Sequence, residues 1–332
     1  VQSPGRYRDR SVEYAGVVGE NLEIPSANPI NYYEAINASD EIEKVIIDGK
    51  LFVPGEKELN PLVIIVPGSL GVGPNHEAHA ETLVSEGYAV FVLDPFGARS
   101  VESTVENQTQ YSFAASAFDV LATYKKLSER EEIDSDRIGA QGHSRGGSAI
   151  LTAVTRKFAD PIIGKQNSLK AAYAVYPWSG HQFLSPEIGE TNLHSIIGEL
   201  DDWLSVQQVE EHIAAITATG ANATIRIVPE AHHSFDRQGE VYEVPEAKVA
   251  PEAPTIMITD DGSMIDPQTG EPSTGMTDFD AFVSALKNGF GKTGAHMGGI
   301  KDQPEIFSTD MINFFGKNFL LEKQKTYIFA NC

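Results

Sequence analysis

The sequence predicts an α/β fold with a doubly wound, mostly parallel sheet flanked by helices. Continuous apolar runs such as PLVIIVPG (residues 61–68) recur along the chain, and such runs are typical of strands buried on both faces of a parallel sheet. Helical patterns separate these runs, so strands and helices alternate. With 332 residues, 41% of them hydrophobic, the chain can bury the core of one large domain.

The expected elements follow in order from Lys44 onward, in a domain of residues 45–332. Residues 1–44 are polar and contain prolines, and we expect an irregular N-terminal arm packed on the domain. KVIIDGKLFVP predicts a strand, an Asp-Gly turn and a second strand. Further strands are expected at residues 61–68, 88–94, 137–141, 171–177, 194–202 and 223–229. Helices are expected at residues 75–86, 111–130, from 145 onward, 204–219 and 304–321.

A segment rich in proline, glycine and acidic residues, 237–300, is inserted before the last helix. Within it, TIMITDDGSMIDPQTGEP predicts a hairpin closed at Asp261 and Gly262. DFDAFVSALKNGF (278–290) predicts an amphipathic helix. Long insertions in compact domains are usually functional or disordered, so the segment is either a lid beside the site or an excursion.

The charge balance excludes several classes of partner. Asp and Glu number 47 against 25 Lys and Arg, a formal net charge of −22. Such a surface repels phosphate backbones and anionic lipids, so we expect neither nucleic acid nor membrane partners. No run reaches the roughly 20 apolar residues of a membrane span. The oligomeric state stays open.

Cysteine usage and the first residue bear on the compartment. The one cysteine is Cys332, so no internal disulfide and no thiolate cluster can form. No signal-peptide pattern is visible. The sequence starts at Val1 rather than Met, which favours an exported protein over a cytoplasmic one, and the compartment remains open.

The stretch IGAQGHSRGGSAILTAV predicts an activated serine. Residues Gly142 to Gly146 fit the pattern G-x-S-x-G, directly after an expected strand and directly before an expected helix. In this setting the turn is sharp and holds the Ser144 hydroxyl above the carboxyl edge of the sheet, while the glycines let helix and strand pack closely. The alternative is a glycine-rich turn with an incidental serine. We choose Ser144 as the candidate nucleophile.

A serine hydroxyl needs a base, and the base needs an acid that orients it. VPEAHHSFD follows the last expected strand and offers His232 and His233; the His-x-Phe-Asp setting favours His233. IIGELDDW ends the preceding strand and places Asp201 in the turn just past it, with Asp202 as the reserve. The chain order Ser144, Asp201, His233 is the order expected for a serine on such a turn.

The carbonyl oxygen that becomes negative during attack needs fixed N–H donors. We expect one from the backbone of Arg145, just after the nucleophile. The other is expected from the loop VPGSLGVG, where we choose the N–H of Ser69, with Leu70 as the alternative; an ordinary loop is the competing interpretation. Arg99 could meet a substrate carboxylate, but a salt bridge to Asp94 or another acid is the favoured interpretation. The candidate pocket residues are Leu70, His143, Trp178 and Arg99.

NHEAHAE holds two histidines, His76 and His79, three residues apart. The His-Glu-x-x-His spacing of zinc-binding helices is absent. We therefore expect both on the helix surface or at the mouth of the site, and we expect neither a metal nor another cofactor.

With these residues in place, the sequence resembles the dienelactone hydrolase family of the α/β-hydrolase superfamily. The resemblance covers about residues 45–319 and rests on VIIVPGSLGVGPNHEAHAETLVSEGYAVFVLDPFGARS, DSDRIGAQGHSRGG, GELDDW and HHSFD. It implies an α/β-hydrolase fold and hydrolysis of esters or lactones through an acyl-enzyme. Two positions depart from the family: Ser144 stands where dienelactone hydrolases proper carry cysteine, and Gly68 stands where they carry the glutamate that partners it. The resemblance therefore does not predict the dienelactone substrate itself.

These observations predict a serine hydrolase that acts on a small-molecule ester or lactone and needs no cofactor. A peptidase or amidase with the same three residues is the first alternative. A binding protein that has lost catalysis on a hydrolase scaffold is the second.

Overall fold

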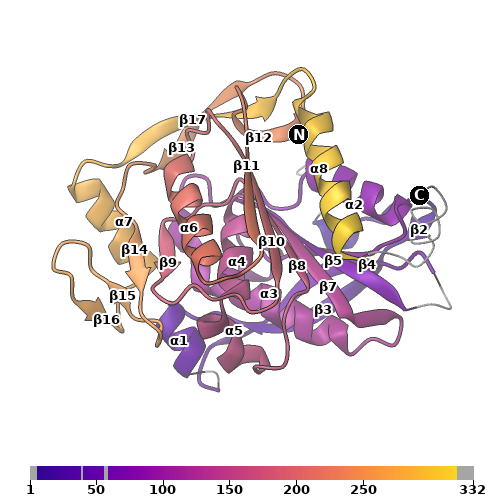
Figure 1. Ribbon diagram of the computed structural model, residues 1–332, viewed down its shortest axis with the longest axis horizontal. Coiled ribbons are helices and arrows are strands. Elements are labelled where there is room, and N and C mark those ends of the chain that lie inside the picture. Colours follow the sequence, from indigo (N-terminus) through magenta and orange to yellow (C-terminus); the bar gives the residue numbers. More distant parts are fainter. Residues whose placement is uncertain (1–5, 39, 56–58, 320–332) are drawn as a thin grey trace.

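One central sheet organises the fold. The computed structural model describes residues 6–38, 40–55 and 59–319, and these form an eight-stranded sheet in the order β11-β10-β8-β7-β5-β6-β4-β3 (Figure 1). Neighbouring strands are parallel from β11 to β6, whereas β4 and β3 run antiparallel at one edge. The strands are β3 (Glu20–Ala27), β4 (Lys44–Phe52), β5 (Asn60–Val66), β6 (Ala89–Asp94), β7 (Ile133–His143), β8 (Ala171–Val175), β10 (Asn192–Gly198) and β11 (Ala223–Val228). The predicted doubly wound, mostly parallel sheet is confirmed.

Helices cover both faces of this sheet. The helices are α1 (Tyr32–Asn37), α2 (Pro74–Ser85), α3 (Phe113–Ser128), α4 (Arg145–Val154), α5 (Arg156–Ile163), α6 (Val206–Ala218), α7 (Asp278–Lys287) and α8 (Gln303–Asn318). On β7, Gly142 faces α4 and Gly139 faces Phe319 at the end of α8. Because positions an odd number apart point to opposite faces of a strand, α4 and α8 lie on opposite sides. Helices α3 and α5 pack beside α4, and α2 meets α8 where His79 contacts Phe307.

Most expected elements are confirmed, with shifted ends. The strand expected at 137–141 begins earlier, at Ile133, and the strand expected at 194–202 ends at Gly198. The second shift leaves Asp201 in the loop beyond the strand, where its side chain can turn toward the sheet edge. Among the described residues, no helix combines the length and apolarity that a membrane crossing requires.

The expected turn at Asp48 and Gly49 is wrong, because β4 runs straight through both residues. Asp48 is buried and accepts hydrogen bonds from Arg6 (2.9 Å) and Arg8 (2.8 Å). Gly49 pairs with β6 at a point where the Phe91 ring crosses the strand, so no side chain fits there. The Asp-Gly pair therefore serves a buried ion pair and a close approach between strands rather than a reversal of the chain.

The irregular lead-in expected at the N-terminus is wrong for residues 20–27, which form the edge strand β3. The short strands β1 (Glu13–Tyr14) and β2 (Val17–Val18) precede it. β3 has only one well-buried side and contains Pro25. An edge strand tolerates proline and polar residues because one side of it is unpaired, and it therefore lacks the apolar run that marks a central strand.

Residues 237–300 fold into small sheets and a helix along one side of the molecule (Figure 1). Strands β12 (His233–Gln238), β17 (Lys292–Gly299) and β13 (Tyr242–Val249) form one sheet. The other sheet joins β16 (Pro272–Ser273), β15 (Met264–Ile265), β14 (Ile256–Ile258) and β9 (His181–Phe183). The predicted hairpin is confirmed by the antiparallel pairing of β14 and β15, and the predicted helix by α7.

The position of Gly49 makes a stability prediction. In Gly49→Ala, the new Cβ would lie 2.7 Å from the carbonyl oxygen of Val92 and closer still to the Phe91 ring. We expect the free energy of unfolding to fall by about 2 kcal/mol, as for other overpacked cores, measured by urea denaturation. Gly316→Ala is the matched control, since no atom lies near that Cβ and alanine favours helices. Equal stability of Gly49→Ala and wild type would contradict the prediction.

Candidate active site

The turn at Ser144 joins β7 to α4 in a conformation that few residues other than glycine adopt. Ser144 has φ 56° and ψ −112°, and its N–H donates to the carbonyl oxygen of Val175 (2.9 Å). A Cβ at Gly142 would collide with the carbonyl of Gly146, and a Cβ at Gly146 would lie 2.6 Å from the carbonyl oxygen of Pro67. Both glycines of G-x-S-x-G are thus required by backbone packing, and the serine stands at the first turn of a helix.

The side chains of Ser144, His233 and Asp201 form a continuous hydrogen-bonded line. His233 Nε2 lies 3.0 Å from Ser144 Oγ, and His233 Nδ1 lies 2.7 Å from Asp201 Oδ2. The second carboxylate oxygen of Asp201 accepts the backbone N–H of Trp203 (3.0 Å). The Asp201 side chain is fully buried and that of His233 nearly so. The structure thus brings together three residues chosen from the sequence, while their catalytic role stays a prediction.

The competing candidates lie elsewhere. Asp202 accepts hydrogen bonds from the backbone N–H of His296 (2.8 Å) and pairs with its ring (2.7 Å), at an exposed place. The ring of His232 lies beside the same His296 ring, 5.9 Å between centroids. His233 rather than His232 therefore contacts Ser144, and Asp201 rather than Asp202 contacts His233.

Two aromatic side chains hold the His233 ring. The Trp203 ring stacks on it with centroids 5.3 Å apart. The Tyr176 ring packs against it in a tilted arrangement, with centroids 4.6 Å apart. Trp203 directly follows the Asp201 loop and lies against the imidazole. Tyr176 (φ 33°) and Ser234 (φ 54°) share with Ser144 a positive φ. Such backbone strain tends to gather at functional sites.

Ser69 and Arg145, the expected oxyanion donors, both border the same cavity as Ser144. The N–H of Arg145 lies in the first turn of α4, where no carbonyl of the helix can accept it. The Ser69 loop is tightened by a backbone bridge between Gly68 and Gly71, and the Ser69 carbonyl accepts the N–H of Thr104 (2.8 Å). Oxyanion binding by these two N–H groups stays a prediction.

A cavity of about 320 Å³ opens at Ser144. Phe113 and Trp178 stack in its lining, with centroids 4.3 Å apart. Burial lowers the pKa of the lining His181 to about 3 and raises that of Asp278 to about 6. Residues from β13 to just past α7 supply the other side: Lys248, Val249, Ala250, Ala253, Pro254, Ile256, Pro267, Gln268, Asp278, Ala281, Phe282, Ser284, Ala285, Asn288 and Phe290. The inserted segment therefore borders the cavity at the nucleophile.

The four candidate pocket residues separate into three groups. Trp178 lines the large cavity. Leu70 and His143 line a smaller cavity of about 30 Å³ that Ser144 also borders, where Leu70 is exposed and His143 buried. Arg99 lines neither cavity; its guanidinium pairs with Asp119 (2.8 and 3.0 Å). The expectation of a salt bridge at Arg99 is confirmed, with Asp119 rather than Asp94 as the acid, and its pocket role is wrong.

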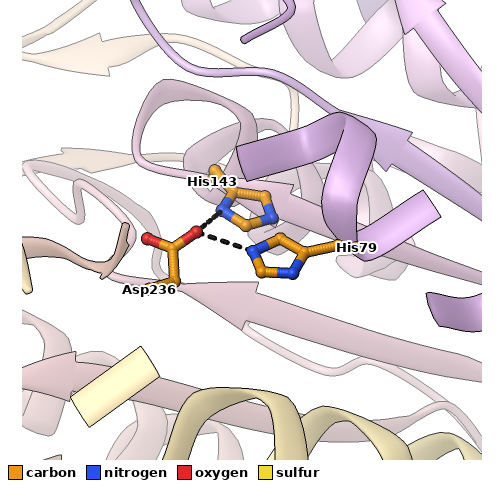
Figure 2. A group of neighbouring side chains, drawn as sticks. All are labelled: His79, His143 and Asp236. Atoms are coloured by element: carbon orange, nitrogen blue, oxygen red, sulfur yellow. Dashed lines mark hydrogen bonds and ion pairs between the residues drawn. The ribbon is translucent and has the colours of Figure 1, made fainter. Parts of the chain in front are cut away.

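His143, the residue before Ser144, belongs to a buried polar network built around Asp236 (Figure 2). Its Oδ2 pairs with His79 Nε2 (2.7 Å) and accepts from the Asn75 amide (2.9 Å), and its Oδ1 accepts the hydroxyl of Tyr176 (2.9 Å). His79 comes from α2, Asp236 from β12 and His143 from the end of β7. Although burial raises the pKa of Asp236, the stronger effect of His79, His143 and Asn75 holds it well below its usual range.

The expectation that His76 and His79 lie on the helix surface is wrong, because both are buried. The alternative, the mouth of the site, is nearer for His76, which lines the small cavity beside Ser144. Three residues apart on α2, the two histidines face inward together, and His76 contacts the His143 ring at 4.7 Å between centroids. Burial lowers the pKa of His76 to about 3 and that of His143 well below its usual value. Both rings are therefore neutral at neutral pH.

His79, His143 and Asp236 are the described residues whose spacing comes closest to a metal site, with ligand atoms within 4.8 Å of one another. The Gln141 amide lies 3.0 Å from His143 Nε2, and the Tyr176 hydroxyl lies 2.9 Å from His143 Nδ1. Asp236 already has three hydrogen-bond partners, Asn75, His79 and Tyr176. The three side chains take part in a buried hydrogen-bond network, and the absence of a metal or another cofactor stays a prediction.

A family model for the dienelactone hydrolase family matches residues 47–254. The chain belongs to the dienelactone hydrolase family. The match includes Ser144, Asp201 and His233. Among solved structures, a dienelactone hydrolase-like promiscuous phosphotriesterase from metagenomic libraries superposes with a TM-score of 0.50 at 15% identity, over 90% of this chain and 98% of that one. This similarity confirms the α/β-hydrolase fold.

Curated relatives of this dienelactone hydrolase family member include bacterial cutinases. Cutinase est1 of Thermobifida alba is 25% identical over 130 residues, 39% of each chain. Cutinase 2 of Thermobifida cellulosilytica is also 25% identical, over 39% of this chain and 44% of that protein. The chain thus spans about two fifths of the length of these relatives.

The Asp236 network predicts a pH-dependent stability. Since folding depresses the pKa of this carboxyl, its stabilisation is complete well above the unfolded value of about 3.9 and is lost as the pH falls below it. Asp236→Asn should lower the free energy of unfolding by about 3 kcal/mol at pH 7, measured by urea denaturation. The difference from wild type should shrink between about pH 5 and pH 3.

The matched control is Asp302→Asn. Asp302 is exposed, and its side chain makes no capping hydrogen bond to α8. We expect this substitution to change the free energy of unfolding little at any pH. A difference between Asp236→Asn and wild type that stays constant from pH 7 to pH 3 would rule out a depressed pKa at Asp236.

Proposed function

We propose that this chain is a serine hydrolase that cleaves a small-molecule carboxylic ester or lactone through an acyl-enzyme. The observation that carries the proposal is the His233 imidazole, which lies within hydrogen-bond distance of both Ser144 Oγ (3.0 Å) and Asp201 (2.7 Å). Membership of the dienelactone hydrolase family and the partial similarity to cutinases favour an ester over other acyl compounds.

In the first half of the reaction, Ser144 Oγ attacks the ester carbonyl carbon while His233 Nε2 takes the hydroxyl proton. The electron pair of the C=O bond moves to the oxygen, which the N–H groups of Ser69 and Arg145 bind. When that pair returns, the bond to the leaving oxygen breaks and His233 gives its proton to the alcohol. Asp201 holds the ring orientation and stabilises its charged form.

In the second half, water attacks the acyl carbon and His233 takes a proton from that water. The same N–H groups bind the second oxyanion. Collapse breaks the bond to Ser144 Oγ, which recovers its proton from His233, and the carboxylic acid leaves. The cycle consumes one water, and none of these steps calls on a cofactor.

The test compares p-nitrophenyl acetate and butyrate with peptide p-nitroanilides, and adds labelling by a fluorophosphonate probe. The proposal expects ester turnover that exceeds anilide turnover, and labelling at Ser144. Anilide turnover without ester turnover would point to a peptidase or amidase instead. Failure of the wild-type protein to label or to turn over any substrate would favour a binding protein.

Substitutions in the three side chains give the sharpest expectation. Ser144→Ala and His233→Ala should each lower kcat for p-nitrophenyl butyrate by about 10⁶ with the fold intact by circular dichroism. Asp201→Asn should lower it by about 10⁴, because the amide favours the wrong imidazole tautomer. Asp202→Asn is the matched control, since that residue pairs with His296. Loss of activity in Asp202→Asn but not in Asp201→Asn would move the acid to residue 202.

We further propose that residues 237–300 select the substrate by closing one side of the cavity. The side chain of Ala285 on α7 lines the cavity, so Ala285→Trp should fill part of it. We expect kcat/KM for p-nitrophenyl benzoate to fall at least about tenfold relative to that for the acetate. Lys287→Trp, on the same helix but exposed and outside the lining, should leave the ratio unchanged. If Ala285→Trp leaves the ratio of kcat/KM for the benzoate and the acetate unchanged, residues 237–300 do not select the substrate.

A further inference from the structure

The Arg145 side chain is a buried cation beside the nucleophile. It is 3% exposed, and its Cζ lies 4.2 Å from the ring centroid of Phe113 and 4.8 Å from that of Tyr111. Among the described residues, its Nε and Nη2 have no hydrogen-bond partner. Burial lowers its pKa to about 10, which still leaves it charged at neutral pH. A nearby charge that acts on it is that of Asp278, a buried carboxyl that lines the same cavity.

One side chain, Gln108, makes the hydrogen bonds that fix this cation. Arg145 Nη1 donates to both the backbone oxygen and the side-chain Oε1 of Gln108, each at 3.0 Å. Oε1 also accepts the hydroxyl of Thr104 (3.1 Å). From the other end of the same carboxamide, Nε2 donates to Ser69 Oγ (2.9 Å). Gln108 thus contacts both residues whose N–H groups would bind the oxyanion.

The two donors belong to separate loops, one after β5 and one after β7, so their spacing is not set by local chain geometry. Oxyanion donors act only when they lie at the correct distance from the developing charge, and small misplacements can cost up to about a hundredfold in rate. A carboxamide that joins the two loops would set that spacing. It would also hold a positive charge nearby, where low dielectric strengthens its effect.

Resting on the proposed hydrolase function, we propose that Gln108 is a positioning residue for the oxyanion site. It holds the Ser69 loop and the Arg145 guanidinium in the arrangement that stabilises the tetrahedral intermediate. Gln108 touches neither the nucleophile nor the base by any hydrogen bond of the described residues, and it acts on the reaction through Ser69 and Arg145.

The simpler interpretation is that Gln108 only stabilises its own turn. Gln110 tests this, because it lies in the same short 3-10 helix (Gln108–Gln110). Its amide donates to the backbone oxygens of Ser103 (2.9 Å) and Asn107 (3.0 Å), but it lines no part of the large cavity. Gln110→Ala therefore removes turn contacts and leaves the Ser69 and Arg145 connections intact.

The experiment compares wild type with Gln108→Ala, Gln108→Glu and Gln110→Ala. It measures kcat and KM for p-nitrophenyl butyrate, the inhibition constant of an aryl trifluoromethyl ketone, and the melting temperature. The ketone adds Ser144 Oγ to its carbonyl carbon and places the resulting oxyanion between the N–H donors. Its affinity therefore reports on that site without turnover.

We expect kcat to fall about 10- to 100-fold in Gln108→Ala with KM within about twofold of wild type, and ketone affinity to weaken by a similar factor. Gln108→Glu keeps the shape and the acceptor for Arg145, but Ser69 Oγ, which accepts from the wild-type amide, would have to donate to the carboxylate instead. The added negative charge also neutralises the cation. A loss of at least about tenfold in Gln108→Glu separates positioning from simple packing, even if Gln108→Ala folds poorly. Gln110→Ala should stay within about twofold of wild type.

The proposal is overturned if Gln108→Glu retains wild-type kcat and ketone affinity, or if Gln110→Ala loses as much as Gln108→Ala. A wild-type protein that hydrolyses no ester and binds no ketone would instead refute the proposed function. The two failures are therefore distinguishable, because the first requires an active wild-type protein.

Discussion

The strained turn at Ser144 is the constraint on which the site depends. Its positive φ persists because β5, β7 and the start of α4 approach too closely for any side chain at Gly142 or Gly146. That packing aims the hydroxyl out of the carboxyl edge of the sheet, where loops from distant strands can reach it. Asp201 lies on the loop after β10, and His233 is the first residue of β12. The tight backbone thus places the nucleophile, and the topology of the sheet brings its partners.

Buried polar groups fix how those loops meet. His143 directly precedes Ser144 in the chain, and Asp236 follows His233 by three residues. The Tyr176 hydroxyl lies 2.9 Å from His143 Nδ1 and 2.9 Å from Asp236 Oδ1. Gln108 makes a comparable connection between Ser69 and Arg145. Hydrogen bonds are directional and costly to leave unmade in a buried place. Such links hold loop positions more sharply than apolar packing alone.

The sequence predicted those parts of the molecule that depend on local pattern. Apolar runs predicted the central strands. The pattern G-x-S-x-G predicted the turn at Ser144, because its glycines are required by packing within that turn. The prediction failed where contacts with distant residues decide the structure. Asp48 and Gly49 have the sequence of a turn, but Asp48 binds Arg6 and Gly49 packs against the Phe91 ring. The burial of His79 likewise depends on Asp236, far along the chain. Gln108 carries no local signal, since its partners come from two other loops.

The central claim is that Ser144 becomes acylated during turnover, and intact-protein mass spectrometry after rapid acid quench tests it most directly. Wild type quenched in the first turnovers with p-nitrophenyl acetate should gain the mass of one acetyl group, located by digestion on the peptide that contains Ser144. The adduct should disappear as substrate is exhausted. Ester turnover without any such adduct, or with the acetyl group on another residue, would contradict the account.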